Sequence, residues 1–274
     1  RERHGAVLKW VGINEHGELD LEAYEAAFSE RTKFVALTQM SNALGTITPA
    51  KALIDTAHAH GVPILLDGCQ GAVHMPTDVQ ALDCDFYVFS GHKVFGPTGI
   101  GVLYGKADLL DGMRPWRGGG EMIREVSQEA VSYGDAPHRF EAGTPPIIEA
   151  VGLGAALDYM QNIGFEAMQA HENALRDHAM EAVGALNRVR IYGTSPDKGA
   201  IVSFGVDGVH PHDLAMVMDR SGVAIRAGHH CAQPLMKHFG VPATARASFA
   251  MYNTHEEVDI LAASLSKAID FFGS

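Results

Sequence analysis

A lysine and an aspartate each follow a short apolar run, and together they could hold an aldehyde cofactor. Lys93 lies in the glycine-rich residues 90–101, directly after the apolar residues 86–89, and Asp67 closes the apolar residues 63–66. At the ends of neighbouring strands, such a pair is the minimal set for pyridoxal phosphate. The lysine forms an imine with the cofactor, and the acid keeps the pyridine nitrogen protonated. The alternatives are a solvated surface lysine and a helix N-cap aspartate.

A cysteine belongs to the second group of residues that could do chemistry. Cys231 lies in the segment Arg-Ala-Gly-His-His-Cys-Ala at residues 226–232. Arginine neighbours favour a thiolate, so Cys231 could serve as a nucleophile, whereas the alternative is an inert, buried thiol. Arg246 follows an apolar approach and suits a bidentate grip on a substrate carboxylate, with a surface ion pair as the alternative.

The first half of the chain alternates short apolar runs with helical patterns. Strands are expected at residues 7–11, 34–38, 64–66, 86–89 and 100–104, and helices at residues 19–28 and 50–60. This βαβ rhythm predicts a mostly parallel sheet flanked by helices. Ligands bind at the carboxyl ends of such strands, where Asp67 and Lys93 are expected to lie.

The second half of the chain predicts a smaller α+β domain. Residues 111–146 are rich in glycine and proline. A long irregular segment of this kind usually belongs to a functional site or an interface. After them, helices are expected at residues 147–163, 165–186, 211–220 and 256–272, and strands at 201–204 and 223–225. We therefore expect a large domain over residues 1–161 and a small C-terminal domain over residues 162–274. The small domain contains the loop that carries Cys231.

Composition narrows the function classes. The chain has 274 residues, 46% hydrophobic and 20% charged, with a formal net charge of −12, so we expect no nucleic-acid partner and no membrane association. Three cysteines do not make a disulfide framework, and the first residues lack the character of a secretory signal. A cytoplasmic location follows as the expectation. The fifteen histidines lack metal-ligand spacing, so no metal site is expected.

Several motifs together resemble the class V aminotransferase family of fold type I. They are Ser-Asn-Ala-Leu-Gly at residues 41–45, Asp-Gly-Cys-Gln at 67–70, Ser-Gly-His-Lys at 90–93, Arg-Phe-Glu-Ala-Gly-Thr-Pro at 139–145, Arg-Ala-Gly-His-His-Cys-Ala at 226–232 and Ala-Met-Tyr-Asn-Thr at 250–254. Within the family, the cysteine motif resembles the group II, or SUF-type, cysteine desulfurases. The resemblance covers essentially the whole chain and implies a pyridoxal-phosphate fold type I large domain followed by a smaller C-terminal domain.

The resemblance implies a role for each motif residue. Lys93 would bind pyridoxal 5'-phosphate covalently and move the substrate proton. Asp67 would pair with the pyridine nitrogen and Gln70 with the phenolic oxygen, while Ser90 and His92 would hold the phosphate. Thr144 would reach the phosphate of the other subunit in a homodimer. Asn42, at the cofactor site, and Arg246 would bind the substrate carboxylate, with Arg226 near the substrate. Cys231 would take the substrate sulfur as a persulfide and leave alanine.

One departure from the family concerns the start of the chain. Members carry a further segment ahead of this region, with a histidine that stacks on the cofactor ring and a threonine-bearing turn at the phosphate. The sequence opens at Arg1 without an initiator Met. We therefore expect an N-terminally truncated fragment, and the activity of this chain by itself stays open.

Three functions remain open from the sequence. The first is a cysteine desulfurase that acts on L-cysteine, supplies iron–sulfur cluster assembly and passes sulfur to an acceptor protein of the SUF system. The alternative is a selenocysteine lyase, acting on L-selenocysteine, or another class V reaction such as transamination. The third is an inactive truncated chain that serves as a dimerisation or partner-binding module.

Overall fold

The computed structural model describes residues 1–273, which form two compact units. Unit 1 contains Arg1–Thr32, Gln39–Pro49 and the chain from Phe165 onward, and unit 2 contains Lys33–Thr38 and Ala50–Gly164. The chain passes from unit 2 to unit 1 after Gly164, close to the domain boundary expected at residue 161. The sequence-based boundary groups Arg1–Thr32 and Gln39–Pro49 with the large domain, whereas in the structure these segments group with the C-terminal residues. Contacts between segments distant in sequence cannot be inferred from their order along the chain. The two folding domains themselves stay a prediction.

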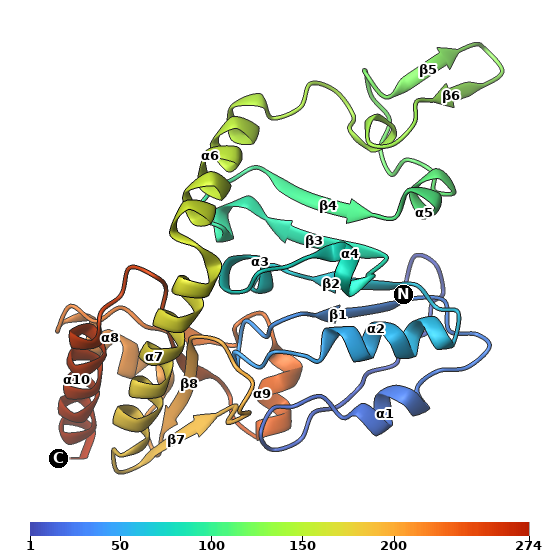
Figure 1. Cartoon of the computed structure of the whole chain (residues 1–274). Helices are drawn as coiled ribbons and strands as arrows, with labels where there is room; N and C mark the ends of the chain where they lie inside the picture. The colour runs from blue at the N-terminus through green and yellow to red at the C-terminus, as the bar shows by residue number, and fades with distance from the viewer. Residues whose placement is uncertain (274) are drawn as a thin grey trace. The chain divides into compact units, whose positions relative to one another are not determined.

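Unit 2 is built on a four-stranded sheet with the order β1-β2-β3-β4 (Figure 1). The strands are β1 (Val35–Thr38), β2 (Ile64–Asp67), β3 (Phe86–Ser90) and β4 (Gly101–Gly105). The first three are parallel, and β4 runs antiparallel to β3. Fully buried Ile64 and Leu66 alternate along β2 with half-buried residues, as expected for an inner strand covered by helices. The mostly parallel α/β fold expected from the sequence is confirmed.

The helices of unit 2 bury apolar residues at helical spacing. They are α2 (Ala50–Ala59), α3 (Gly71–His74), α4 (Val79–Leu82), α5 (Ala107–Asp111) and α6 (Ile147–Ile163). Leu53, Ile54 and Ala57 form the buried face of α2, which ends just before Gly61, a residue with a positive φ of 66°. A hairpin of β5 (Ile123–Val126) and β6 (Val131–Tyr133) projects beside α5 (Figure 1). Two 3-10 turns cover Gly91–Lys93 and His138–Phe140.

Unit 1 contains a second, antiparallel sheet with the order β7-β8-β10-β9. Its strands are β7 (Val189–Tyr192), β8 (Ile201–Val206), β9 (Arg226–Gly228) and β10 (Thr244–Ser248), and its helices are α1 (Leu21–Ala26), α7 (Phe165–Gly184), α8 (Pro211–Asp219), α9 (Gln233–Phe239) and α10 (His255–Gly273). One core cluster joins α7, α8 and α10 to the sheet, with Phe204 and Leu265 fully buried in it. This is the α+β arrangement that the sequence predicts.

Two predicted strands are wrong. Residues 7–11 form no strand, because no segment hydrogen-bonds to them as a sheet partner, and Val7 and Trp10 are exposed. Residues 223–225 also lie outside the sheet, since the pairing with β10 starts only at Arg226. In both places the β-branched composition is right, but a strand exists only where a neighbour completes its hydrogen bonds.

Candidate functional site

The carboxyl ends of β2 and β3 bring together the lysine, the aspartate and their polar neighbours. Asp67 is the last residue of β2, and it lies opposite Val88 of the parallel strand β3. Ser90 ends β3, and Lys93 follows within the 3-10 turn Gly91–Lys93. Parallel neighbours present their carboxyl ends at one edge of the sheet, so these groups share that edge.

Cys69 shows how close the groups at this edge are. The main-chain amide of Cys69 donates to Asp67 Oδ1 at 2.9 Å. Burial raises the pKa of the Cys69 thiol, and the Asp67 carboxylate beside it raises that pKa further, whereas Lys93 and the main chain of Ser90 lower it. The thiol therefore lies within the influence of all three groups. It stays protonated, which makes Cys69 a poor nucleophile.

Close packing shapes the loops that carry this group. A Cβ added to Gly68 would meet the ring of Tyr87 at 1.9 Å, so only glycine lets the chain turn away from Asp67 against that ring. The amide of Gly96 donates to the carbonyl oxygen of Gly91 at 3.0 Å and so holds the turn around Lys93. A Cβ on Gly96 would meet that oxygen at 2.9 Å, so the turn needs glycine there.

Of the other residues predicted for the cofactor, Gln70, Ser90 and His92 lie in the loops after β2 and β3, whereas Thr144 lies elsewhere in unit 2 and Asn42 belongs to unit 1. Ser90 Oγ and His92 Nδ1 lie 2.8 Å apart and form a polar pair at the end of β3. Gln70 is the residue before α3, and its side chain does not cap that helix. Thr144 lies in an exposed turn shortly before α6. The structure thus brings five predicted residues to neighbouring loops of unit 2, while nothing in it links Thr144 to them.

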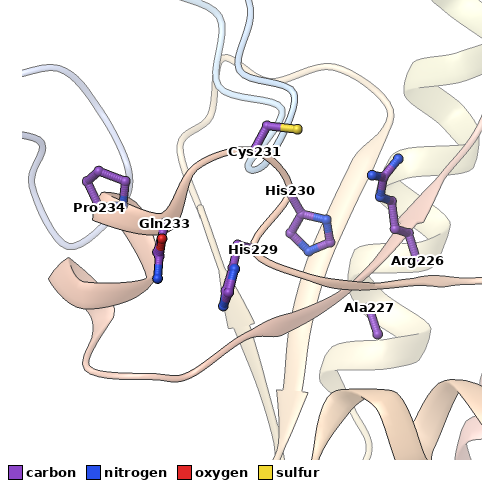
Figure 2. Close-up of a pocket in the computed structure, with 7 residues that line it drawn as sticks. All are labelled: Arg226, Ala227, His229, His230, Cys231, Gln233 and Pro234. Atoms are coloured by element: carbon purple, nitrogen blue, oxygen red, sulfur yellow. The ribbon is translucent and has the colours of Figure 1, made fainter.

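Cys231 lies on the wall of a cavity of about 440 Å³ in unit 1. The cavity is lined by Arg226, Ala227, His229, His230, Cys231, Gln233 and Pro234, which follow one another along β9 and the turn into α9 (Figure 2). Cys231 is exposed, whereas Cys69 is half-buried and Cys84 is buried. Burial also raises the pKa of the Cys84 thiol. Among the three free thiols, Cys231 is therefore the one that a substrate in solution can reach.

Arg226 and Arg246 face each other across strands β9 and β10. They are directly opposite in the antiparallel register, so their side chains leave the sheet on the same face. Neither arginine forms an ion pair with a carboxylate within residues 1–273. Burial and the charge of Arg226 lower the pKa of Arg246. Two guanidinium groups that repel each other form a site that a bound carboxylate would stabilise.

Arg246 is held by the segment that carries Asn42. Its Nη1 donates to the main-chain oxygen of Asn42 at 2.6 Å, and its buried Nε has no hydrogen-bond partner within the described residues. Asn42 in turn donates from Nδ2 to the carbonyl oxygen of His230 at 2.7 Å. The segment is fixed because Leu44 is buried with Tyr192 in a small apolar cluster. Asn42, Arg246 and the cysteine loop therefore form one hydrogen-bonded group.

Two residues of this group were missing from the sequence-based site. His230 is 3% exposed, and its Nε2 contacts Thr244 O at 3.1 Å and Thr244 Oγ1 at 3.0 Å. Burial, followed by the charge of Arg246, lowers the pKa of His230 to about 4. Thr244 and Arg246 are two positions apart in an alternating run, and this spacing on one strand could have suggested a shared face.

Comparison with known proteins identifies the family. The protein-family model described as Aminotransferase class-V matches residues 1–261. The chain belongs to the aminotransferase class-V family. Enzymes of this family use pyridoxal phosphate, which is bound through a lysine and a carboxylate that faces the pyridine nitrogen. Lys93 and Asp67 are residues of these two types, and they lie at one edge of the sheet.

Relatives within the family include cysteine desulfurases. A cysteine desulfurase of Synechococcus elongatus is 52% identical over 263 residues, which is 96% of this chain and 42% of the relative. A cysteine desulfurase of Pectobacterium atrosepticum is 48% identical over 274 residues, which is 100% of this chain and 67% of the relative. The chain thus spans between two fifths and two thirds of the length of these class V relatives.

Solved structures match the class V fold closely. The Escherichia coli cysteine desulfurase CsdA, described as an S-sulfonic acid form, matches with a TM-score of 0.90 and 40% identity over 94% of this chain and 64% of that one. The apo cysteine desulfurase of Thermococcus onnurineus NA1 matches with a TM-score of 0.94 and 37% identity over 98% and 68%. The α/β fold of a pyridoxal-phosphate enzyme is therefore confirmed.

Neither a membrane-spanning helix nor a cluster of metal ligands is found in the described part of this class V chain. No helix within residues 1–273 is long and apolar enough to cross a membrane. The same residues contain no group of three or more histidine, cysteine, aspartate or glutamate side chains arranged to hold a metal ion.

Proposed function

We propose that this protein is a pyridoxal-phosphate-dependent cysteine desulfurase. It converts L-cysteine to L-alanine and takes the sulfur onto Cys231 as a persulfide, for use in iron–sulfur cluster assembly. The observation that carries this proposal is the exposed Cys231 in a cavity lined by Arg226, which lies opposite Arg246 on the neighbouring strand, an arginine that forms no ion pair within residues 1–273. The identity of about half of all positions to cysteine desulfurases supports the same reaction.

The residues at the edge of the unit 2 sheet fit the cofactor chemically. Asp67 accepts one main-chain hydrogen bond at Oδ1, and a carboxylate has further acceptor capacity for a protonated pyridine nitrogen. Ser90 and His92 supply polar groups for a phosphate, and Lys93 supplies the amine for covalent attachment. Gln70 would contact the phenolic oxygen. When bound, pyridoxal phosphate supplies an electron sink for the charge that develops at the substrate α-carbon.

The chain's own groups then have defined tasks. Lys93 takes the proton from the substrate α-carbon and returns it, while Asp67 keeps a proton on the pyridine nitrogen. The guanidinium of Arg246 binds the substrate carboxylate with Asn42, and Arg226 adds positive charge beside it. The Cys231 thiolate attacks the substrate sulfur. An S–S bond forms, the substrate C–S bond breaks, and the carbon that loses sulfur gains a proton to give alanine.

The protein is proposed to act as a homodimer in the cytoplasm. Thr144 would reach the phosphate of the other subunit, and an apolar stripe on α6 begins three positions after it. Ile148 in this stripe is 84% exposed, and Ile147 and Val151 beside it are exposed too. A second copy that covers the stripe would bring Thr144 to the interface. An acceptor protein of the SUF system would remove the sulfur from exposed Cys231.

The proposal is tested by supplying pyridoxal phosphate and L-cysteine to the purified chain. We expect alanine and a persulfide on the Cys231 peptide in mass spectrometry, and neither product in Cys231→Ala. Asn187→Ala, at an exposed position far from the cysteine loop in sequence, is the matched control and should behave like the wild type. Alanine formation at the wild-type rate in Cys231→Ala would contradict the proposal and favour a lyase or transaminase.

A further inference from the structure

The backbone around the nucleophile has an unusual conformation. His230 and Cys231 have φ values of 52° and 59°, so two consecutive residues with side chains occupy the left-handed region. Non-glycine residues rarely do so, because Cβ crowds the following carbonyl, and the conformation persists only where surrounding contacts impose it. The cysteine loop, defined as residues 229–232, therefore needs an anchor.

Asn42 provides the first half of such an anchor. Its Nδ2 donates to the carbonyl oxygen of His230, the group directly before Cys231, at 2.7 Å. Asn42 is rigidly based, because the hydroxyl of Ser41 accepts from the amides of Ala43 and Leu44 at 3.2 and 3.1 Å. Ser203 Oγ donates to the carbonyl oxygen of Ala43 as well. A fixed donor therefore holds the peptide that leads into Cys231.

The ring of His230 provides the second half. Its Nε2 lies against the carbonyl oxygen of Thr244, which can only accept, so Nε2 carries the proton. Because burial lowers the pKa of His230 to about 4, the ring is neutral near pH 7. The ring therefore donates from Nε2 and fixes the loop to β10.

We propose that Asn42 and His230 are positioning residues that hold Cys231 in its left-handed conformation on the cavity wall. Asn42 fixes the main chain before the thiol, and His230 ties the loop to Thr244 of β10. The importance of this anchor for turnover rests on the proposed function, since that function makes Cys231 the nucleophile. The anchor itself does not depend on it.

Hydrogen–deuterium exchange of the chain without cofactor tests the anchor. Asn42→Asp has the same shape but presents a carboxylate that cannot donate, so the cysteine loop should open more often. We expect the amide of Ala232, which donates to His229 O at 2.8 Å, to exchange about tenfold faster or more. Peptides from β8 and α10 should exchange as in the wild type, and Asn187→Ala should change nothing.

His230→Gln keeps a side chain that can hydrogen-bond but removes the buried ring. It should also accelerate exchange in the cysteine loop. In the loaded enzyme it should lower kcat about tenfold or more while KM for L-cysteine stays within about twofold, because no contact of His230 with substrate is proposed. A general loss of folded protein would also accelerate hydrogen–deuterium exchange in the core peptides of β8 and α10. A lower kcat with unchanged KM and unchanged exchange in those peptides therefore points to the cysteine loop.

The outcomes separate the anchor from the proposed function. Unchanged exchange of the cysteine loop in both Asn42→Asp and Asn42→Ala would overturn the anchor, whatever the activity. Faster exchange confined to that loop supports it, even if the chain forms no alanine. If Asn42→Ala unfolds, the isosteric Asn42→Asp decides. A raised KM in the Asn42 variants concerns the separate role of Asn42 at the substrate carboxylate.

Discussion

At the scale of single residues, exposure and charge separate one cysteine from the other two. The pKa values of the Cys69 and Cys84 thiols are raised by burial, which keeps both protonated and inert. Cys231 alone among the free thiols is exposed, and it lies beside Arg226 in the cavity wall. The three thiols therefore differ in reactivity because burial protects Cys69 and Cys84, whereas Cys231 is accessible.

Arg246→Lys should weaken binding of the substrate carboxylate. A lysine loses the planar fork that can bind a carboxylate with two hydrogen bonds, and it also loses the Nη1 contact to Asn42 O. We expect KM for L-cysteine to rise about 10- to 100-fold, which corresponds to roughly 1.4–3 kcal/mol. Steady-state alanine formation measures this. Arg124→Lys on the β5–β6 hairpin is the control, and an unchanged KM in Arg246→Lys would remove Arg246 from the substrate site.

His230 should make the stability of the protein sensitive to acid. Its pKa is about 4 in the folded chain and about 6.5 in an unfolded one, so the unfolded state binds more protons between these values. Its contribution is therefore full above pH 6.5 and is lost as the pH falls toward 4, by an amount of roughly 3 kcal/mol. In urea unfolding, the free energy of unfolding of His230→Gln should fall less steeply than that of the wild type as the pH is lowered from 6.5 to 4. If the two free energies change in parallel with pH, His230 does not have this role.

At the scale of secondary-structure elements, the sheet of unit 2 has different tasks at its two ends. Its carboxyl edge presents Asp67 and Lys93, whereas its amino edge is held by Asp85, just before β3. Asp85 Oδ2 accepts from the Ile64 amide at 2.8 Å and lies 2.9 Å from His58 Nε2, so it joins β2, β3 and α2. The buried carboxylate of Asp85 has a structural role, because it accepts from the main-chain amide at the start of β2 and pairs with the side chain of His58.

Asp85→Asn should weaken this junction. Burial by itself would raise the pKa of Asp85, but hydrogen bonds from His58, the Ile64 amide and Lys106 outweigh burial and lower it. The stabilisation is present above the unfolded pKa of about 4 and is lost as the pH falls through the lower folded value. At pH 7 we expect a loss of about 1–3 kcal/mol in urea unfolding.

The difference between Asp85→Asn and the wild type should narrow as the pH falls below about 4 and through the lower folded pKa of Asp85, because the carboxylate then takes up a proton in the folded chain too. Asp55→Asn is the matched control, since Asp55 is exposed on α2 and pairs with Lys51 four positions away. Its free energy of unfolding should change by less than about 0.5 kcal/mol. If Asp85→Asn and Asp55→Asn lower the free energy of unfolding by the same amount, the buried contacts of Asp85 do not stabilise the fold more than an exposed ion pair does.

At the scale of the whole molecule, the exposed stripe of α6 bears on assembly. The inner face of that helix buries Leu153 and Met160, whereas Ile147, Ile148 and Val151 are exposed on its outer face. A contiguous apolar stripe on a helix is typical of an interaction surface. Its place just after Thr144 agrees with the proposal that this part of the chain meets a second copy.

Ile148→Asp should therefore weaken the proposed homodimer. A carboxylate in the middle of an apolar interface loses its hydration without gaining a partner, which costs several kcal/mol. We expect sedimentation velocity to show a dimer for the wild type and a monomer for the variant at the same concentration. Met216→Lys, at an exposed apolar position on α8, should stay dimeric. If the wild type sediments as a monomer, the dimer proposal fails.

Local pattern was sufficient for the sheet of unit 2 and for the residues at its edge. Short apolar runs followed by Asp67 and by Ser90 predict neighbouring parallel strands, and the structure has them. Pattern failed for residues 7–11 and 223–225, because strand formation depends on a partner that local composition does not specify. It also gave no sign of the β5–β6 hairpin or of β10, whose sequence Thr-Ala-Arg-Ala-Ser is weakly apolar.

The sequence by itself determined the family and predicted the residue types of the candidate site, with Cys231 in a loop close in sequence to Arg226. Only the tertiary structure decided that Asn42 holds that loop from 188 positions away, and that Arg246 faces Arg226 across two antiparallel strands. It also decided that His230 is buried, which lowers its pKa to about 4. The physical reason is that propensity and spacing act over a few residues, whereas register, burial and long-range hydrogen bonds arise from the packing of distant segments.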